Sequence, residues 1–271
     1  MKSRKPIYVL SLVLAILLLI ANGAGLIMPE VLYARENSNW FAQSVGQDIA
    51  DLVLVFPTLI ITANLIYRNN RKALLVWAGV MAYLVYTFMI YCFAIHFNQL
   101  FVVYCLILGL SFYLFIWFIL SHFKEQTRNW FNDEMSVKMV AIYMIVVAGA
   151  FYILWLMQII PPNLKGTVPA ETINAGLVTN PVHVLDLSIC LPGIMITGIL
   201  LLRRHLLGLL LTPVVLSFFI LMDLTIAGLM MILKWRGFIV NDIVLIAMFV
   251  LALLSAIFLV VFLRNVKTGN N

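Results

Sequence analysis

The chain has 271 residues, of which 64% are hydrophobic and only 10% are charged. Soluble domains carry about 25% charged residues, so this composition excludes a soluble globular protein. The net charge of +6 does not indicate nucleic-acid binding, because the basic residues stand in short clusters between apolar runs. Membrane barrels are excluded as well, since their strands alternate polar and apolar residues and the runs here are continuous.

Eight apolar segments follow one another, each close to the roughly 20 residues that a helix needs to cross a bilayer. They predict an all-α, polytopic transmembrane bundle that occupies residues 1–271 as a single domain. The first segment follows a basic start, as in a signal peptide, but it is long enough to be kept as a span. No internal repeat is evident. The predicted spans are residues 7–28, 49–67, 73–95, 100–121, 139–160, 184–202, 207–233 and 239–263.

The distribution of Lys and Arg predicts the orientation of these spans, because basic residues accumulate on the cytoplasmic side. With a cytoplasmic N-terminus, 13 of the 17 Lys and Arg residues fall inside. An even number of spans then also places the C-terminus in the cytoplasm. The four basic residues left outside are Arg35, Lys165, Lys234 and Arg236.

Four aspartates lie near the predicted outer ends of spans, where even-numbered helices begin. A carboxylate at a helix N-terminus can cap free N–H groups and interacts with the helix dipole, worth about 0.3–1 kcal/mol each. Capping alone is therefore one sufficient explanation for Asp48, Asp51, Asp186 and Asp242.

Asp223 does not fit that explanation, because it lies sixteen residues into the predicted span 207–233. It is about 15 Å short of the outer end of that helix. Burying an acid at such depth costs at least about 2.5–3.5 kcal/mol on insertion scales. The group must be protonated, paired or hydrated. Asp223 is thus predicted to belong to a functional site, with a satisfied interhelical hydrogen bond as the alternative.

Two pairs of polar residues are spaced three apart, so each pair shares one helical face. They are Asp48 with Asp51, and His183 with Asp186. A histidine beside acids can relay protons, bind a metal or sense pH, although an interfacial histidine can also be merely structural. We predict one polar binding site, open to the outside, formed by Asp223, Asp186, His183, Asp51, Asp48 and His96.

Known catalytic motifs are missing: the sequence contains no HExxH, no GxSxG and no Walker A loop. The three cysteines lie inside apolar runs and indicate neither a disulfide framework nor a zinc site. Tyr91 and Tyr104 are expected at the membrane interface, where aromatic residues are common. No catalytic residue, metal or cofactor can be assigned.

Three segments resemble parts of uncharacterised bacterial multispanning membrane proteins: QDIADLVLVFP (47–57), NQLFVVY (98–104) and NPVHVLDLSICLPGIMITGILLLRR (180–204). The resemblance implies an inner-membrane protein and no activity.

Three functions are compatible with these features. The first is a small-solute or ion transporter, or an accessory membrane subunit, in which Asp223 is the buried protonatable or cation-binding group. The second is a membrane-embedded enzyme acting on a lipid-linked substrate, with His183 as acid/base and the carboxylates holding a divalent metal. The third is a sensory or assembly protein whose polar residues only fix helix packing. The partners expected are the lipid bilayer and a small molecule or ion, and no nucleic acid.

Overall fold

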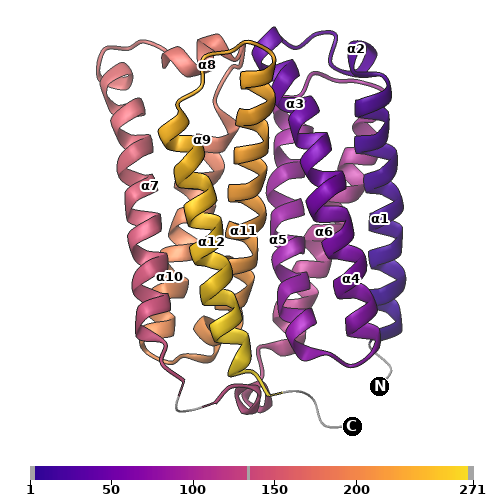
Figure 1. Ribbon diagram of the computed structural model, residues 1–271, viewed down its shortest axis with the longest axis vertical. Coiled ribbons are helices and arrows are strands. Elements are labelled where there is room, and N and C mark those ends of the chain that lie inside the picture. Colours follow the sequence, from indigo (N-terminus) through magenta and orange to yellow (C-terminus); the bar gives the residue numbers. More distant parts are fainter. Residues whose placement is uncertain (1–3, 133–134, 268–271) are drawn as a thin grey trace. The chain divides into compact units, whose positions relative to one another are not determined.

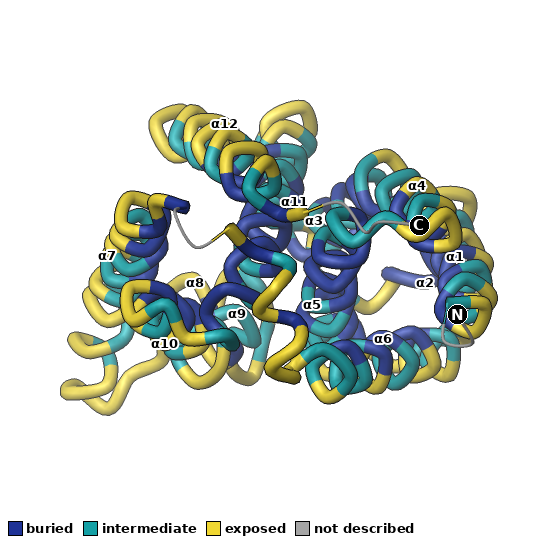
Figure 2. Tube along the Cα trace, turned by 90° about the horizontal axis from the view of Figure 1, so that it is seen from below, coloured by how far each residue is buried: buried dark blue, intermediate teal, exposed yellow. Residues whose placement is uncertain are grey.

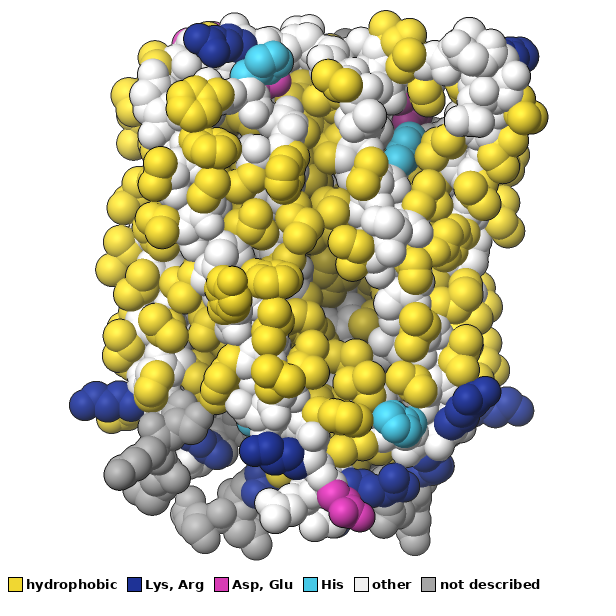
Figure 3. Space-filling model, turned by 180° about the vertical axis from the view of Figure 1, so that it is seen from behind, with side chains coloured by type: hydrophobic (Ala, Val, Ile, Leu, Met, Phe, Trp, Pro, Cys, Tyr) yellow, Lys and Arg dark blue, Asp and Glu magenta, His cyan; other side chains and the backbone are white. Residues whose placement is uncertain are grey.

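The computed structural model describes residues 4–132 and 135–267, so Lys2 and the extreme C-terminus lie outside the described residues. The described part contains helices and no β-strand, and eight helical segments are long and apolar enough to cross a membrane. The predicted helical class and the eight spans are confirmed (Figure 1). Hydrophobic side chains run along the helices, while most Lys and Arg side chains lie near helix ends (Figure 3).

The spans are α1 (Arg4–Ile27), α3–η1–α4 (Ser38–Tyr67), α5 (Arg71–Ala94), α6 (Phe101–His122), α7 (Lys138–Leu164), α9–η3–α10 (Pro181–Leu202), α11 (Leu206–Trp235) and α12 (Asp242–Arg264). Short helices α2 (Pro29–Leu32), η2 (Glu125–Trp130) and α8 (Ala170–Asn174) lie in connections.

The helices form two compact units. The first contains α1–α6, most of α11 and all of α12, and the second contains α7–α10. In the first unit, α1 packs on α3, α4 and α6, while α5 packs on α4 and α6. Helix α5 is the most buried span, and its dark trace stands out in Figure 2. In the second unit α7 packs on α10. The predicted single domain stays a prediction.

The second and sixth spans begin earlier than predicted, at Ser38 instead of 49 and at Pro181 instead of 184. Polar residues in the first turns of these helices lower the local hydropathy. The hydropathy pattern therefore predicted that each helix begins further along the chain than it does. Asparagines cap these helices: the Asn37 side chain accepts from the Trp40 N–H, and the Asn180 side chain accepts from the Val182 N–H. Asp48 and Asp51 therefore lie deep inside a helix, and the capping explanation is wrong for both.

Two short π-helical segments interrupt the spans, η1 (Asp51–Val55) and η3 (Asp186–Cys190). Each begins at an aspartate whose carbonyl accepts an N–H five residues later, and each precedes a proline at the second position of the next helix. A proline has no N–H and its ring collides with the carbonyl four residues earlier. The wider π turn relieves that collision, and such turns are frequent at functional sites.

These segments belong to an internal repeat that the sequence analysis missed. Residues 51–75 and 186–210 align without a gap, with nine identities. The identical pairs are Asp51/Asp186, Leu52/Leu187, Pro57/Pro192, Ile61/Ile196, Thr62/Thr197, Leu65/Leu200, Arg68/Arg203, Leu74/Leu209 and Leu75/Leu210.

The backbone repeats in the same register. Asn69 and Arg204, which are aligned, have φ angles of 70° and 50° in the turn that follows each span, a region that non-glycine residues seldom adopt. The next residue caps the following helix in both copies: Asn70 accepts from Ala73 N–H, and His205 Nδ1 accepts from Leu207 N–H. The π-helical segment and the turn that follows each span thus recur at aligned positions of α3–η1–α4–α5 and α9–η3–α10–α11.

Equivalent positions of the repeat also meet in space. A Cβ atom at Gly79 of α5 would lie 2.8 Å from the Val214 carbonyl oxygen and 2.4 Å from Ser217 Cβ in α11. When the ungapped alignment is continued, Gly79 falls opposite Val214, so α5 and α11 cross at corresponding residues. Glycine at this position permits the close approach of the two backbones.

Candidate functional site

Asp48 lies at the centre of a buried hydrogen-bonded cluster in the first unit. Its side chain is fully buried, and its two oxygens accept from the Tyr33 hydroxyl and from the Tyr91 hydroxyl, each at 2.7 Å. Tyr33 follows α2, and burial raises its pKa above the ordinary value, with the Asp48 charge as a further cause. The phenol of Tyr33 therefore stays protonated as a donor.

Gly25 of α1 makes room for this arrangement. A Cβ atom at Gly25 would lie 2.0 Å from Asp48 Oδ2 and 2.8 Å from the Tyr33 hydroxyl. Real Cβ atoms essentially never approach other atoms so closely, so a side chain at this position would displace the carboxylate or the phenol. The absence of a side chain at Gly25 is a condition of the Asp48–Tyr33 contact.

Asp51, one helical turn further on, is bound through only one of its oxygens. Asp51 Oδ1 accepts from the Tyr83 hydroxyl and from Gln47 Nε2, both at 3.0 Å. Gln47 also donates to the Tyr83 oxygen, which lies 2.9 Å from the Thr225 hydroxyl of α11. This network ties α3, α5 and α11 together at the start of the π-helical segment.

The other Asp51 oxygen, Oδ2, is buried and has no hydrogen-bond partner. The amide of Asn22 in α1 interacts with the Asp51 carboxylate, but neither Asp51 Oδ2 nor the amide oxygen and nitrogen of Asn22 has a hydrogen bond of ordinary geometry. Asn22 and Asp51 are both fully buried. Buried polar groups are nearly always satisfied, so the weak contact between Asp51 and Asn22 sets these two residues apart from the rest of the cluster.

The Asp48–Asp51 cluster contains no basic counter-charge. Among the described residues, ion pairs join His96 to Glu36 and Lys234 to Asp242, and neither involves this cluster. Asp51 is 13 residues from the start of the helical segment Ser38–Tyr67, or about 20 Å along its axis. Two carboxyl groups thus lie well within a span with neutral partners only.

The other predicted site residues of the first unit lie apart from this cluster. The Asp223 side chain is buried, and the described residues give it no hydrogen bond. Asp223 is two residues before Thr225, or about 200° around α11, so it faces away from Tyr83. His96 lies in the loop after α5, and its side chain is half-exposed. The backbone N–H of His96 donates to Glu36 Oε1 at 2.7 Å.

His183 and Asp186 lie together in the second unit. The Trp155 indole N–H of α7 donates to Asp186 Oδ2 at 2.8 Å, and the Trp155 and His183 ring centroids are 4.8 Å apart. His183 is 6% exposed, and its Nε2 is buried without a partner. His183 and Asp186 correspond to Asp48 and Asp51 in the repeat. A site shared by all six predicted residues stays a prediction.

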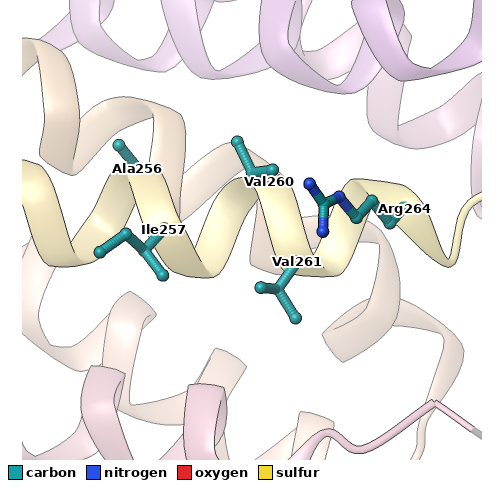
Figure 4. A pocket seen from close by; sticks show the side chains of 5 residues that line it. All are labelled: Ala256, Ile257, Val260, Val261 and Arg264. Carbon is teal, nitrogen blue, oxygen red and sulfur yellow. The ribbon is translucent and has the colours of Figure 1, made fainter.

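Two surface hollows offer alternative places for a ligand. One of about 560 Å³ lies beside the Tyr33 end of the buried cluster and is lined by Glu30, Tyr33, Ala34, Glu36, Ser38, Phe41, Arg236 and Phe238. The other, of about 330 Å³, is a shallow surface of α12 formed by Ala256, Ile257, Val260, Val261 and Arg264 (Figure 4). Its side chains project from one helix and no polar groups converge there, so it lacks the features of a ligand site.

Comparison of the chain with protein-family models, with curated protein sequences and with solved structures finds no match. The site is therefore interpreted from its own chemistry.

Sequence reasoning found the acids of the site but missed their partners. Tyr91 and Tyr104, which were predicted at the membrane interface, have their side chains buried within the protein, and their depth in the membrane stays a prediction. None of Tyr33, Tyr83, Gln47 and Asn22 was among the predicted site residues. The signal that could have found the second half of the pattern was the motif D-L-x-x-x-x-P, which occurs at 51–57 and at 186–192.

Proposed function

We propose that the protein is a cation-coupled membrane transporter of a small solute, in which Asp51 takes up and releases a proton. The observation that carries the proposal is the Oδ2 atom of Asp51, which is buried opposite the Asn22 amide without a hydrogen bond of ordinary geometry, in a cluster without basic residues. Charge in a span costs at least about 2.5–3.5 kcal/mol. Two adjacent carboxylates with neutral partners cannot both stay ionised at that cost.

The hydrogen bonds assign different roles to the two acids. Asp48 accepts phenol hydrogen bonds on both oxygens, each of 2.7 Å, so a proton added to Asp48 would have to displace or reverse one of these donors. Asp51 has one oxygen free. When protonated, its Oδ2–H would donate to the Asn22 amide oxygen, and when ionised it would accept from the Asn22 nitrogen. An amide can satisfy both states by turning over, so Asn22 is suited to a neighbour whose protonation changes.

The proton on Asp51 is testable by chemical labelling. Dicyclohexylcarbodiimide reacts with protonated carboxyl groups in apolar surroundings, and the modified residue is found by mass spectrometry of peptides. We expect labelling of Asp51 that falls as the pH is raised from about 5 to 9, because only the protonated carboxyl group reacts. Asp48 in the same peptide is the internal control and should stay unlabelled.

Substitution and competing ions sharpen this test. The Asp51→Asn variant should lose the label, while Asp242→Asn, at an exposed helix start, should keep it. Protection by Na⁺ at constant pH would identify a metal cation in place of the proton as the coupling ion. An unreactive Asp51 at every pH in that range would overturn the proposal.

The orientation and location also remain proposals. The excess of Lys and Arg on one side supports cytoplasmic N- and C-termini, and the eight spans suit a bacterial inner membrane. The enzymatic alternative has less support: within either unit, the described residues contain no group of three or more His, Cys, Asp or Glu side chains placed to hold a metal ion.

A further inference from the structure

Two cysteines of the first unit lie side by side where α5 and α6 are joined. Cys92 of α5 and Cys105 of α6 are 13 residues apart in the sequence, and their Sγ atoms are 4.0 Å apart. Cys92 is two residues before the end of α5, and Cys105 is the fifth residue of α6. Each is therefore within about 6 Å, along its helix axis, of the loop that joins the two helices.

A Tyr-Cys dipeptide stands at both positions and explains why the two thiols meet. Tyr91 and Tyr104 are buried, and their ring centroids are 5.0 Å apart. Successive residues of an α-helix are about 100° apart around its axis, so the cysteine after each tyrosine lies toward the outside of the contact. Cys92 is partly exposed and Cys105 is exposed. The contact between α5 and α6 thus has a buried tyrosine pair and, beside it, an accessible cysteine pair.

We propose that Cys92 and Cys105 are an oxidation site, at which a small-molecule disulfide converts the two thiols into a disulfide bond between α5 and α6. The sulfur atoms of a disulfide are about 2.05 Å apart. The two Sγ atoms must therefore approach each other by about 2 Å, which rotation of both side chains about their Cα–Cβ bonds can supply. The predicted orientation places this loop outside the cytoplasm, where disulfides persist.

The reaction consists of two thiol–disulfide exchanges, for which oxidised glutathione is a suitable reagent. The thiolate of Cys105, the more exposed residue, attacks one glutathione sulfur and releases the other glutathione as a thiolate. The thiolate of Cys92 then attacks the Cys105 sulfur of this mixed disulfide and releases the second glutathione. The two protein thiols lose two protons and two electrons, which convert one molecule of oxidised glutathione into two of the reduced form.

The bond would fix the end of α5 that supplies a donor to Asp48. It would close a ring of residues 92–105 directly after Tyr91, whose hydroxyl donates to Asp48 Oδ1 at 2.7 Å. The enclosed loop includes His96, whose backbone N–H donates to Glu36. A disulfide restricts the unfolded chain, so the oxidised protein should unfold at a midpoint about 5–10 °C above that of the reduced protein.

Mass spectrometry of the purified full-length protein tests the site. After incubation with oxidised glutathione, N-ethylmaleimide blocks the remaining thiols, and a digest without reductant shows the cross-linked peptides. We expect most of the protein to carry a Cys92–Cys105 cross-link that dithiothreitol reverses, together with the shift in midpoint. Cys92→Ser and Cys105→Ser should each remove the cross-link and the shift, whereas Cys190→Ser should leave both unchanged.

A shifted thiol is the matched control for random collision. Cys105→Ser combined with Leu106→Cys keeps an exposed cysteine on α6 but rotates it about 100° around the helix, so cross-linking to Cys92 should be at least about tenfold slower. Equal rates for the shifted and the original pair would overturn the inference. So would treated protein in which Cys92 and Cys105 both still react with the maleimide, or a cross-link that leaves the midpoint unchanged. The inference does not rest on the proposed function, because the labelling of Asp51 neither requires nor predicts this bond.

Discussion

Replacing Gly25 by alanine should destabilise the protein far more than the same change two residues earlier. At Gly25 the new Cβ would lie 2.0 Å from Asp48 Oδ2 and 2.7 Å from its Cγ. At Gly23 it would meet nothing within 4 Å. Both glycines lie in α1, so Gly23→Ala controls for the general gain from replacing a helical glycine, about 1 kcal/mol or less.

The expected loss follows from two effects at Asp48. Overpacking of a filled interior costs about 1–3 kcal/mol. A displaced carboxylate would also weaken its bond to the Tyr33 hydroxyl, and a hydrogen bond to a charged group is worth about 1.5–3 kcal/mol. With partial relaxation, we expect Gly25→Ala to lower the free energy of unfolding by about 2–4 kcal/mol relative to Gly23→Ala.

Thermal unfolding of the detergent-solubilised variants measures this difference. For a chain of this size, 1 kcal/mol corresponds to about 2–4 °C, so the midpoints should differ by about 4–16 °C. In an Asp48→Ala background the two nearest atoms that Cβ would meet are gone, and the Gly25→Ala penalty should shrink by at least about 1 kcal/mol. Equal midpoints for the two alanine variants, or an unchanged penalty in the Asp48→Ala background, would refute the packing argument.

Two further predictions concern the cluster and the orientation. Tyr33→Phe and Tyr91→Phe should each lower the free energy of unfolding by about 1–3 kcal/mol, because each leaves one buried Asp48 oxygen without its donor. The control Tyr113→Phe, at a 70% exposed position, should have no effect. Identical unfolding midpoints for all three variants would contradict this prediction. A C-terminal fusion should yield a fluorescent cytoplasmic reporter and an inactive periplasmic phosphatase if the bias of Lys and Arg sets the orientation; an active phosphatase would show that the C-terminus is outside.

The spans could be predicted because hydropathy depends on local composition alone. All eight were found, and the structure moves most of their ends by only a few residues. The large error, at the start of the second span, has a physical cause: Gln47 and Asp48 make the first part of that helix polar. Their burial depends on donors from other helices, and a hydropathy profile cannot include such contacts.

The tyrosine donors could not be predicted, because contact between helices depends on their rotation about their axes. Tyr83, Tyr86 and Tyr91 of α5 all looked like interface or packing residues. Only the packing of α5 against its neighbours decides that Tyr83 and Tyr91 reach the aspartates while Tyr86 packs on Phe218. The surroundings of Asp51 Oδ2 are likewise known only once every partner of the carboxylate is known.

The repeat separates what the backbone requires from what the site requires. Pro57 and Pro192 are enough to explain the two π turns, because each proline lacks the N–H that an α-helical turn needs. A proline-driven turn does not, however, require an aspartate at its first residue, since any residue offers the carbonyl that accepts the N–H five positions later. Asp51 and Asp186 nevertheless occupy that position in both copies, although nearly all their neighbours differ. The carboxyl group itself, placed on a widened turn inside a membrane helix, is therefore what the two halves share beyond their fold.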